Sequence, residues 1–448
     1  MQFILLSGGS GKRLWPLSND VRSKQFIPIF PKEDGGHESM LQRVWRHMVS
    51  LYPRENITIA TAQAQASAVQ NQLGANVNLC VEPARQDTFP AMALAAAYLQ
   101  EVKNISEDEP VVVFPVDPYV ERDYFEALGK LGERAAATDA NLVLMGIEPT
   151  YPSEKYGYIL LQMQNEGDHA NDFRKVASFR EKPDERTAAR YIEQGALWNG
   201  GIFACHLSYL LAKAHEQLEF AGYEDLRQRY RQLPKISFDY AVVEREAHIE
   251  AMRFSGTWKD LGTWNTLTEA MGTHLLGKGI LDETSTNTHI VNELNVPIIA
   301  MGLKDIVVAA SPEGVLVADK HHSSYLKPLA EQIHQRIMMA EKSWGSFRVL
   351  DIGERSLTIK VTLLPGHRMH YHSHRRRSER WMITNGEGYA IVDGQRIAVA
   401  SGSFIELPQG CRHLLAADTR LEAVEVQIGS DISIDDKVRY DHYDFALG

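Results

Sequence analysis

Uninterrupted apolar runs alternate with helix-like segments over the first 150 residues or so of the chain. Short apolar runs are typical of buried strands, whereas apolar residues that recur every three or four positions predict helices. This alternation predicts an α/β fold with a mixed, mostly parallel sheet covered by helices, whose ligands bind beyond the carboxyl ends of the strands. The predicted strands are Phe3–Leu6, Ile57–Ala60, Val111–Phe114 and Leu142–Ile147, and the predicted helices are Thr88–Val102 and Tyr124–Ala137.

The pattern changes near residue 275, where the apolar runs become shorter and helical spacing disappears. A small β unit is predicted there, with strands at His289–Val291, Val296–Met301, Ile306–Ala309 and Val315–Ala318. Helical spacing returns at Leu329, Ile333, Ile337 and Ala340, which predicts a packed linker helix. The predicted domains are 1–272, the α/β domain; 273–325, the β unit; 326–342, the linker helix; and 343–448, a second β domain.

Composition narrows the class of protein. A chain of 448 residues exceeds what one hydrophobic core usually serves. The balance of 47 basic against 58 acidic residues argues against a general nucleic-acid or membrane surface, so substrate phosphates must meet local cations. The three cysteines are far apart and lack CxxC spacing, which disfavours disulfides and thiolate zinc sites. No apolar run has membrane length and the first residues enter a strand directly, so a cytoplasmic protein is expected.

Three glycines, Gly8, Gly9 and Gly11, end the first predicted strand. Glycine lets successive N–H groups converge on an anion, and Lys12 and Arg13 add cations beside them. A Walker A loop would need glycine at Leu6 and Ser or Thr at Arg13, and a dinucleotide fingerprint would need a small residue at position 14, so neither motif fits. The pattern favours a triphosphate cradle, and a tight glycine turn with solvated charges is the alternative.

The sequence GGSGKRLWPLS at residues 8–18, followed by SKQF at 23–26, resembles the signature of sugar-1-phosphate nucleotidyltransferases. Its Leu-Trp-Pro-Leu-Ser version is similar to that of the mannose-1-phosphate guanylyltransferase branch. The resemblance implies a Rossmann-like domain that binds GTP and mannose-1-phosphate and releases pyrophosphate. It also implies a nucleotide contact by Leu6, Gly8, Gly9, Gly11, Lys12 and Arg13, and catalytic roles for Arg13, Lys24 and Lys182.

The segment Glu82–Ala91 resembles the part of these enzymes that lies near the nucleotide base. Thr88 is predicted to cap the following helix. The resemblance adds Gln86, Asp87 and Thr88 to the nucleotide site, with Asp87 as an acceptor for guanine N1 and N2. Because Gln86 and Asp87 stand where the family usually has Arg and Asn, the base is less firmly assigned than the reaction.

Two aspartates match the positions that hold Mg²⁺ in the family. Asp117 directly follows a buried apolar run, although Pro118 replaces the usual histidine, and Asp260 lies in a Trp-x-Asp-x-Gly-x-Trp segment. Magnesium is usually held by one or two carboxylates together with substrate phosphates. A turn aspartate and a tryptophan pair around a turn are the alternatives for the two segments.

Several segments between these aspartates resemble the elements that bind the sugar phosphate in the family. They imply that Gly157 lies in the sugar loop, that Glu181 accepts hydrogen bonds from sugar hydroxyls, that Lys182 contacts the phosphate and that Asn199 faces the sugar. The segment Ser237–Glu244 is also similar to a family segment, without an assigned role. Each is a plausible surface loop when taken alone, and their common order along the chain carries the interpretation.

The last hundred or so residues contain the spacing G-x5-H-x-H-x4-E-x6-G followed by G-x5-P-x-G-x2-H, which resembles the two motifs of the cupin family. His372 and His374 are two residues apart, so on a strand their side chains share one face. Glu379 and His413 belong to later strands, and a small jelly-roll barrel can bring all four together. Such ligands suit Zn²⁺, Fe²⁺, Mn²⁺, Co²⁺ or Ni²⁺. A basic, histidine-rich strand pair is the alternative.

A cupin behind a guanylyltransferase resembles the bifunctional enzymes that add type II mannose-6-phosphate isomerase activity, and Arg377, Glu379 and Trp381 match its Arg-x-Glu-x-Trp segment. The resemblance implies exchange of mannose-6-phosphate with fructose-6-phosphate, in which Arg377 holds phosphate or stabilises an enediolate. His372 stands where Gln is usual, and the base is not assigned. We expect a homodimer without nucleic-acid or membrane partners. The alternatives are transfer to another sugar phosphate or from another nucleotide, with the cupin structural or dimerising, and a regulatory binder without catalysis.

Overall fold

The computed structural model describes residues 1–9, 11–19, 21–162 and 172–440. Ser10 of the glycine loop and the last eight residues of the predicted second β domain lie outside the described residues. The chain divides into two compact units, which we call the first unit (Met1–Ser10 with Ser23–Gly272) and the second unit (Gly11–Arg22 with Thr273–Gly448). The segment Gly11–Arg22, here called the signature segment, therefore belongs with the C-terminal part of the chain.

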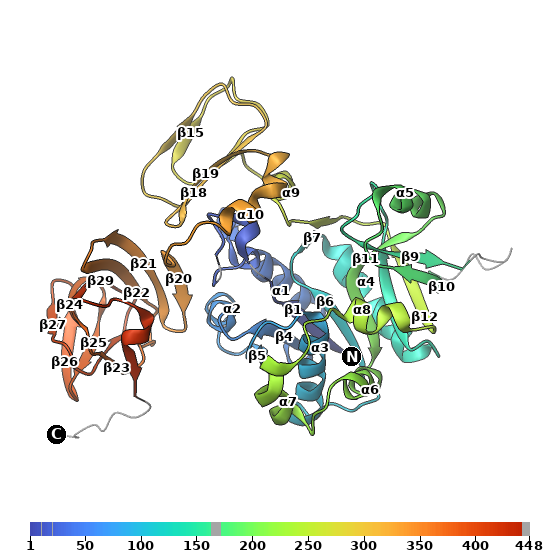
Figure 1. Cartoon of the computed structure of the whole chain (residues 1–448), viewed down its shortest axis with the longest axis horizontal. Coiled ribbons are helices and arrows are strands. Elements are labelled where there is room, and N and C mark those ends of the chain that lie inside the picture. Colours follow the sequence, from blue (N-terminus) through green and yellow to red (C-terminus); the bar gives the residue numbers. More distant parts are fainter. Residues whose placement is uncertain (10, 20, 163–171, 441–448) are drawn as a thin grey trace. The chain divides into compact units, whose positions relative to one another are not determined.

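A nine-stranded sheet forms the centre of the first unit within the described ranges, in the order β5-β4-β1-β6-β11-β8-β12-β10-β9 (Figure 1). Parallel pairs join β1 to β4 and β6, β4 to β5, and β8 to β12, and the other pairs are antiparallel. The mixed sheet predicted from the sequence is confirmed, but parallel pairs are not in the majority, since the described strands form four parallel and five antiparallel pairs. The strands are β1 Gln2–Ser7, β4 Ile57–Ala62, β5 Asn78–Glu82, β6 Pro110–Pro115, β8 Leu142–Ile147, β9 Gly157–Leu161, β10 Phe173–Arg180, β11 Leu197–His206 and β12 Ile249–Phe254.

Helices cover both faces of this sheet, as two neighbouring residues of β1 show, because their side chains are buried on opposite sides. Phe3 packs against the Tyr52 ring at 4.4 Å between centroids, whereas Ile4 joins the core cluster that contains Phe89. A strand buried on both faces reads as an unbroken apolar run. The helices are α1 Met40–Leu51, α2 Ala66–Leu73, α3 Thr88–Ala97 continued by the π-helix η4 Tyr98–Val102, α4 Arg122–Ala137, α5 Glu185–Glu193, α6 Leu207–Gln217, α7 Tyr223–Arg229, α8 Phe238–Ala241 and α9 Trp264–Ala270.

Short elements complete the first unit at the edges of the sheet. Two small antiparallel ribbons pair β2 Phe30–Pro31 with β3 His37–Glu38, and β7 Pro118–Val120 with β13 Trp258–Asp260. Single 3-10 turns lie at η2 Lys24–Phe26, η3 Arg54–Asn56, η5 Tyr230–Gln232 and η6 Val243–Arg245. The β7–β13 ribbon matters most for function because it places Asp260 opposite Pro118, the residue after Asp117.

The start of α3 differs from the prediction that Thr88 caps it. The cap is Asp87, whose carboxylate accepts a hydrogen bond from the Thr88 backbone N–H at 2.8 Å. Asp87 adopts φ 75° and ψ −178°, a strained conformation that residues other than glycine rarely adopt. The Thr88 hydroxyl instead accepts a hydrogen bond from the Phe238 backbone N–H at 2.8 Å, which ties α3 to α8.

Short, mostly parallel strands form the β unit at the start of the C-terminal region. Within the described residues, one sheet has the order β14-β16-β18-β19 and a smaller one pairs β15 with β17. Of the strand pairs described there, only β18–β19 is antiparallel. The elements are β14 Leu275–Leu276, β15 Gly279–Leu281, β16 His289–Asn292, β17 Ile298–Ala300, β18 Ile306–Ser311, β19 Gly314–Asp319, the 3-10 turn η7 His322–Tyr325 and α10 Leu326–Ala330.

The linker helix predicted over 326–342 is wrong beyond its first turns. The helix α10 ends at Ala330, and Met339–Lys342 form strand β20 of the following sheet. Leu329, part of the supposed apolar stripe, is 63% exposed. The backbone N–H groups of Met338 and Met339 donate to the Glu313 carboxylate at 3.0 and 3.2 Å, so tertiary hydrogen bonds replace those of a helix.

The C-terminal β domain consists of two antiparallel sheets that enclose an apolar core, the arrangement predicted for a cupin. Within the described residues their orders are β20-β21-β22-β29-β24-β27 and β26-β25-β28-β23-β30. Trp381 and Leu414 are among the core side chains. The strands are β21 Gly345–Ile352, β22 Ser356–Leu363, β23 His372–His374, β24 Arg377–Asn385, β25 Glu387–Val392, β26 Gln395–Ala400, β27 Phe404–Leu407, β28 His413–Ala417, β29 Leu421–Gly429 and β30 Lys437–Arg439, with η8 at Ile434–Asp436.

Candidate active sites

The first half of the glycine loop follows β1 directly, at the carboxyl end of a parallel strand. The Ser23 hydroxyl donates to the Gly9 carbonyl at 3.1 Å, and the Thr61 hydroxyl donates to the Ser7 carbonyl at 3.1 Å. Gly9 adopts φ 131°, and a Cβ at Gly8 or Gly9 would meet no atom within 4 Å. The loop backbone is therefore held through the carbonyl groups of Ser7 and Gly9, and the space beside Gly8 and Gly9 is open, as an anion cradle requires. Leu6, the last apolar residue before the loop, is half-buried.

The second half of the loop is the signature segment of the second unit. It begins with the 3-10 helix η1, Gly11–Leu14, in which Lys12 is half-buried and Arg13 is exposed. Leu14 and Leu17 are each 1% exposed and anchor the segment. The two predicted phosphate cations therefore sit on a backbone whose apolar side chains fix its conformation.

Lys24 joins the two aspartates that were predicted to hold Mg²⁺. Its Nζ lies 2.9 Å from an oxygen of Asp117 and 3.4 Å from an oxygen of Asp260. Burial lowers the pKa of Lys24, but the two carboxylates more than offset that effect, so the pKa stands above its usual value. One cation already reaches both carboxylates, and carboxylate oxygens are the ligands that Mg²⁺ prefers, so these residues fit a shared Mg²⁺.

Aromatic side chains lie next to this carboxylate pair. The Tyr156 ring contacts Trp198 at 4.8 Å and Trp258 at 5.6 Å between centroids, and Tyr151 contacts Trp198 at 5.1 Å. Burial raises the pKa of Tyr156, and the charge of Asp260 raises it further. The phenol therefore stays protonated and available as a hydrogen-bond donor beside the carboxylates.

Charged and amide side chains gather where the sugar site was predicted. The carboxylate of Glu181 pairs with the ammonium of Lys182, and the Asn199 amide donates to Asp239 at 2.6 Å. Burial raises the pKa of Asp239 to about 6, and the charge of Glu181 contributes. A Cβ at Gly157 would lie 2.4 Å from a Glu181 oxygen, so a larger residue there would displace the Glu181 carboxylate. These residues offer acceptors and one cation, the groups that bind a phosphorylated sugar.

The predicted base-binding residues divide between surface and interior. Asp87 is exposed, whereas Gln86 is 4% exposed and its amide donates to the backbone carbonyls of Tyr230 and Arg231 at 3.1 and 2.8 Å. The Gln86 amide therefore holds η5 to the turn between β5 and α3. Among the three predicted residues, the structure leaves Asp87 with an exposed side chain.

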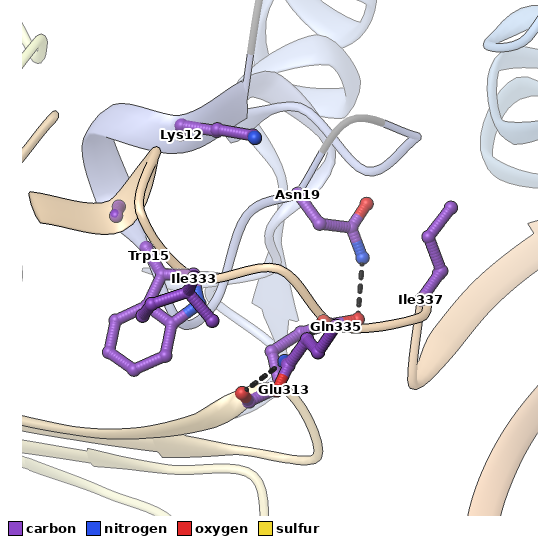
Figure 2. A pocket seen from close by; sticks show the side chains of 8 residues that line it. Lys12, Trp15, Asn19, Glu313, Ile333, Gln335 and Ile337 are labelled. Atoms are coloured by element: carbon purple, nitrogen blue, oxygen red, sulfur yellow. Dashed lines mark hydrogen bonds between the residues drawn. The ribbon is translucent and has the colours of Figure 1, made fainter. Parts of the chain in front are cut away.

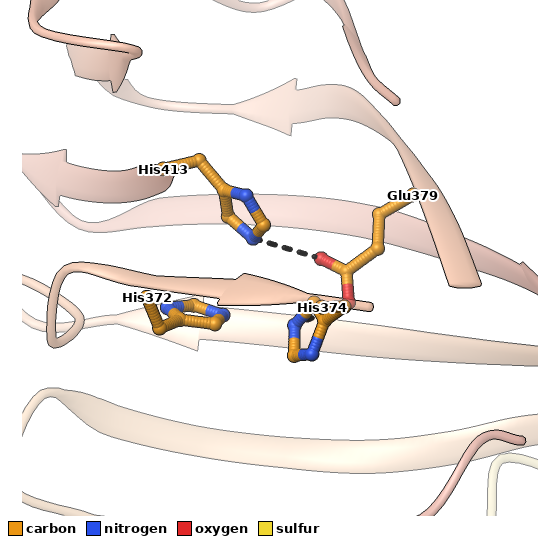
Figure 3. A group of neighbouring side chains, drawn as sticks. All are labelled: His372, His374, Glu379 and His413. Atoms are coloured by element: carbon orange, nitrogen blue, oxygen red, sulfur yellow. Dashed lines mark ion pairs between the residues drawn. The ribbon is translucent and has the colours of Figure 1, made fainter. Parts of the chain in front are cut away.

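The cupin residues form a tight group in the interior of the barrel (Figure 3). Possible ligand atoms of His372, His374, Glu379 and His413 all lie within 4.8 Å of one another. The Glu379 carboxylate reaches His374 Nε2 at 3.0 Å and His413 Nε2 at 3.3 Å. The prediction that β23 presents both histidines on one face is confirmed, and β24 and β28 supply the other two residues.

Each of these histidines has a backbone carbonyl partner for its other ring nitrogen. His372 Nδ1 lies 2.7 Å from the His370 carbonyl, His413 Nδ1 lies 3.0 Å from that of Cys411, and His374 Nδ1 lies 3.3 Å from that of Asp436. A proton on Nδ1 leaves Nε2 as the lone-pair nitrogen that faces the group, which is the orientation that a histidine metal ligand needs. The residues therefore fit a divalent transition metal.

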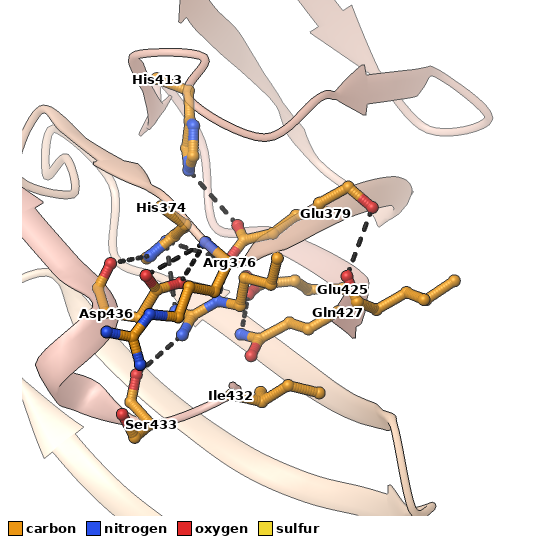
Figure 4. A network of polar contacts seen from close by, with 12 residues as sticks. His374, Arg376, Glu379, His413, Glu425, Gln427, Ile432, Ser433 and Asp436 are labelled. Atoms are coloured by element: carbon orange, nitrogen blue, oxygen red, sulfur yellow. Dashed lines mark hydrogen bonds and ion pairs between the residues drawn. The ribbon is translucent and has the colours of Figure 1, made fainter. Parts of the chain in front are cut away.

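A polar network surrounds the cluster (Figure 4). Arg377 donates to Glu379 at 3.1 Å and to the Ser433 carbonyl at 2.8 Å. The Asp436 carboxylate accepts from the Arg376 backbone N–H at 3.1 Å and so closes the turn between β23 and β24. Burial raises the pKa of Glu425 to about 8, and the charge of Glu379 adds to that effect. Arg377 is therefore fixed against the ligands rather than free at the surface.

The sequence interpretation missed Asp239 and Tyr156 in the first unit and Glu425 in the cupin. Asp239 lies in the segment Ser237–Glu244, whose similarity to the family was visible without a role for any residue. The alternation of β29 places Glu425 and Gln427 on one face, and Glu425 accepts from the Gln427 amide there. An acidic residue at an inward strand position was the available signal for Glu425.

The fold and the sites define the class of protein as a nucleotidyl transferase with an attached cupin. Residues 2–275 match the family model described as nucleotidyl transferase, and residues 329–442 match that of the mannose-6-phosphate isomerase C-terminal domain. The chain belongs to the mannose-1-phosphate guanylyltransferase family whose members carry this C-terminal isomerase domain. No helix in the described residues is long and apolar enough to span a bilayer.

Named relatives match nearly the whole chain. A protein of Vibrio cholerae serotype O1 is 30% identical over 98% of this chain and 99% of its own length. The mannose-1-phosphate guanylyltransferase of Escherichia coli K12 and the xanthan biosynthesis protein XanB of Xanthomonas campestris are each 28% identical, over 98% of this chain and 97% of theirs. A solved structure from Thermus thermophilus, described as a mannose-1-phosphate geranyltransferase, is 29% identical with a TM-score of 0.62, over 74% of this chain and 98% of that one.

Proposed function

We propose that this chain transfers GMP from GTP to mannose-1-phosphate, which yields GDP-mannose and pyrophosphate. The observation that carries the proposal is the pair of aspartates, Asp117 and Asp260, which reach one cation beside the end of the sheet. Family membership supplies the substrates, because the named relatives are mannose-1-phosphate guanylyltransferases.

The reaction needs no covalent participation by the protein. An oxygen of the sugar phosphate attacks the α-phosphorus of GTP; the new O–P bond forms as the bond to the bridging oxygen breaks, and its electron pair leaves with pyrophosphate. Arg13, Lys24 and Lys182 offset the charge that gathers on the phosphates. Asp117 and Asp260 would hold Mg²⁺, which when bound supplies further positive charge. Glu181, Asn199 and Asp239 orient the sugar, and positioning of this kind accounts for much of the rate.

A matrix of nucleoside triphosphates against sugar-1-phosphates, followed by pyrophosphate release, tests the transferase. We expect GTP with mannose-1-phosphate to give the highest kcat/KM. A clear preference for another pair would support the alternative of a transferase for a different nucleotide or sugar. Absence of turnover with every pair, from a folded protein supplied with Mg²⁺, would contradict the proposal.

A second activity, interconversion of mannose-6-phosphate and fructose-6-phosphate, is proposed for the cupin. The buried group of His372, His374, Glu379 and His413 favours it, and Arg377 beside them offers a guanidinium to phosphate or to an enediolate. A metal such as Zn²⁺, Co²⁺, Mn²⁺, Fe²⁺ or Ni²⁺ would supply polarisation of the substrate oxygens. Formation of fructose-6-phosphate that a chelator abolishes tests this activity, and its absence from metal-loaded protein would leave the cupin a structural or dimerising module.

A further inference from the structure

We propose that Glu313 is a positioning residue for guanylyl transfer: it holds the signature segment, and with it Lys12 and Arg13, in the conformation that binds the nucleotide. Glu313 lies in the turn between β18 and β19, nearly 300 residues from the segment in sequence. The inference rests on the proposed transferase function, because it takes its effect from the nucleotide site.

The 311–314 turn touches the signature segment at three places. The Asn19 side-chain amide donates to Glu313 at 2.8 Å, and the Ser311 hydroxyl donates to the Pro16 carbonyl at 2.6 Å. Gly314, at φ 148°, faces the Trp15 indole so closely that a Cβ would lie 2.6 Å from a ring carbon. The turn therefore holds the segment at Trp15, Pro16 and Asn19, the residues that follow Lys12 and Arg13.

The same carboxylate also binds the chain that leads into the cupin. Gln335 donates to Glu313 at 3.2 Å, and the backbone N–H groups of Met338 and Met339 donate at 3.0 and 3.2 Å. Asn19 completes the connection by donating to the Met339 carbonyl at 3.1 Å. Met339 is the first residue of β20, so the signature segment is hydrogen-bonded to an edge strand of the cupin sheet.

These contacts line a small cavity of about 50 Å³, bounded by Lys12, Trp15, Asn19, Glu313, Ala330, Ile333, Gln335 and Ile337. Figure 2 shows Asn19 and Gln335 turned toward Glu313 from two different parts of the chain. Glu313 is 8% exposed and Asn19 is 9% exposed. A buried carboxylate is stable when several donors satisfy it, and loss of the acceptor would leave those donors unpaired. Glu313 thus joins three segments: the signature segment, the turn between β18 and β19, and the chain that leads into the cupin.

Loss of the Glu313 contacts should weaken binding of the nucleotide and leave binding of the sugar phosphate nearly unchanged. Phosphate contacts need cations at defined positions, and a small displacement of such groups can cost roughly a hundredfold in rate. The predicted residues for mannose-1-phosphate, Glu181, Lys182 and Asn199, all lie in the first unit. Loosening the signature segment should therefore raise the KM for GTP while the KM for mannose-1-phosphate stays nearly unchanged.

Four variants of the full-length protein test the proposal by steady-state pyrophosphate release. Glu313→Ala removes the acceptor, and we expect the KM for GTP to rise by about tenfold or more. Glu313→Gln keeps an oxygen for Asn19 and for the backbone N–H groups of Met338 and Met339 and loses only the side-chain contact with Gln335, whose amide still donates to the backbone carbonyl of residue 313 at 2.7 Å, so the KM for GTP should rise much less than in Glu313→Ala. Asn19→Asp keeps the oxygen that accepts from the Val21 and Arg22 backbone N–H groups at 2.8 and 2.7 Å, but it sets a second negative charge against Glu313. Asp282→Ala, which removes hydrogen bonds to Ser285 and Gly302 inside the β unit, is the matched control.

The pair Asn19→Asp and Glu313→Gln distinguishes positioning from a general loss of stability. Adding Glu313→Gln to Asn19→Asp removes the like charge, so the double variant should bind GTP more tightly than Asn19→Asp alone. The KM for mannose-1-phosphate should remain near the parent value in both variants, which a general loss of stability would not predict. This comparison remains decisive if Glu313→Ala does not fold.

The outcomes separate the inference from the function on which it rests. A parent protein that turns over no GTP would overturn the proposed function and this inference with it. An active parent whose KM for GTP is unchanged by Glu313→Ala and Asn19→Asp would overturn the inference alone. Effects of Asn19→Asp and Glu313→Gln that simply add, or an equal rise for Asp282→Ala, would also overturn it.

Discussion

The two sites of this protein hold their charges in opposite ways. In the first unit, the Asp117 and Asp260 side chains are 41% and 33% exposed and share the ammonium of Lys24. In the cupin, Glu379 is 2% exposed and lies among His374, His413 and Arg377. The first site is open and partly solvated, whereas the second is enclosed by the barrel.

This difference follows from the fold that carries each site. The aspartates lie on the short β7–β13 ribbon and the loop before it, beside the ends of the parallel strands, where two large substrates must enter together. The cupin group lies inside a small barrel, where backbone carbonyls just before β23 and β28 and in η8 each hold one of its three histidines. We infer that the transferase site is completed by its substrates and their metal, whereas the cupin site is shaped before anything binds.

The substitution His374→Ala tests whether the buried cupin group is a metal site, and we expect it to have the largest effect. Loss of one of the four buried ligands should remove the transition metal and bring isomerase activity to background. Metal content by mass spectrometry and fructose-6-phosphate formation measure the two effects, and guanylyl transfer should persist.

His367→Ala is the control, since His367 is exposed and its Nδ1 lies 2.9 Å from the Pro365 carbonyl, outside the cluster. Retention of metal and isomerase activity in His374→Ala would show that the group is a buried polar network and not a metal centre.

The transferase half is tested by Asp260→Ala. We expect guanylyl transfer to fall by roughly 10³-fold, the upper end of what loss of one transition-state contact costs. Lys24 would then pair with Asp117 alone, and Asp117 alone would remain to hold the metal, so both cations would be bound more weakly. Pyrophosphate release at saturating GTP and mannose-1-phosphate measures the effect.

Asp34→Ala serves as the control for that experiment, because Asp34 is exposed and pairs with Lys32 at 3.0 Å away from the site. Equal losses in both variants, or a parallel loss of isomerase activity in Asp260→Ala, would contradict independent sites.

The regular elements of the fold could be predicted from the sequence because their signals are local. The run Phe3–Leu6 became β1, and the helical spacing from Tyr124 became α4. The prediction of a linker helix failed for a non-local reason. The backbone N–H groups of Met338 and Met339 donate to the Glu313 carboxylate instead of to carbonyls one helical turn earlier. Four apolar positions at helical spacing could not reveal a partner from another part of the chain.

The same distinction between local and non-local signals applies to the residues of the two sites. His372 and His374 share a face because strand geometry requires it, so their proximity could be predicted from spacing alone. Asp239 could not be found in this way, since its contact with Asn199 joins α8 to β11 across the first unit. The cap of α3 shows the same limit, because the Thr88 hydroxyl is directed to the Phe238 backbone rather than to its own helix.

Arg13→Ala asks whether an exposed cation on the signature segment contributes to the open site. We expect turnover to fall by roughly 10²–10³-fold, because a guanidinium fork that meets phosphate oxygens acts most strongly on the developing charge. Arg122→Ala, an exposed arginine paired with Glu126 at 3.0 Å on α4, is the control. Undiminished turnover in Arg13→Ala would refute this role.

The smallest expected effect concerns Asp239, whose pKa burial and Glu181 raise from 3.8 to about 6. A carboxyl group whose pKa is higher in the folded than in the unfolded protein binds protons more tightly when folded, so its contribution to stability falls as pH rises from about 4 to about 6. The cost of the buried charge is then fully present above pH 6 or so. Asp239→Asn keeps an acceptor for Asn199 without that charge. We therefore expect its thermal midpoint, relative to the parent, to rise as pH increases through this range and then to level off. A difference between the two proteins that is constant across the range would show that Asp239 is solvated like Asp117.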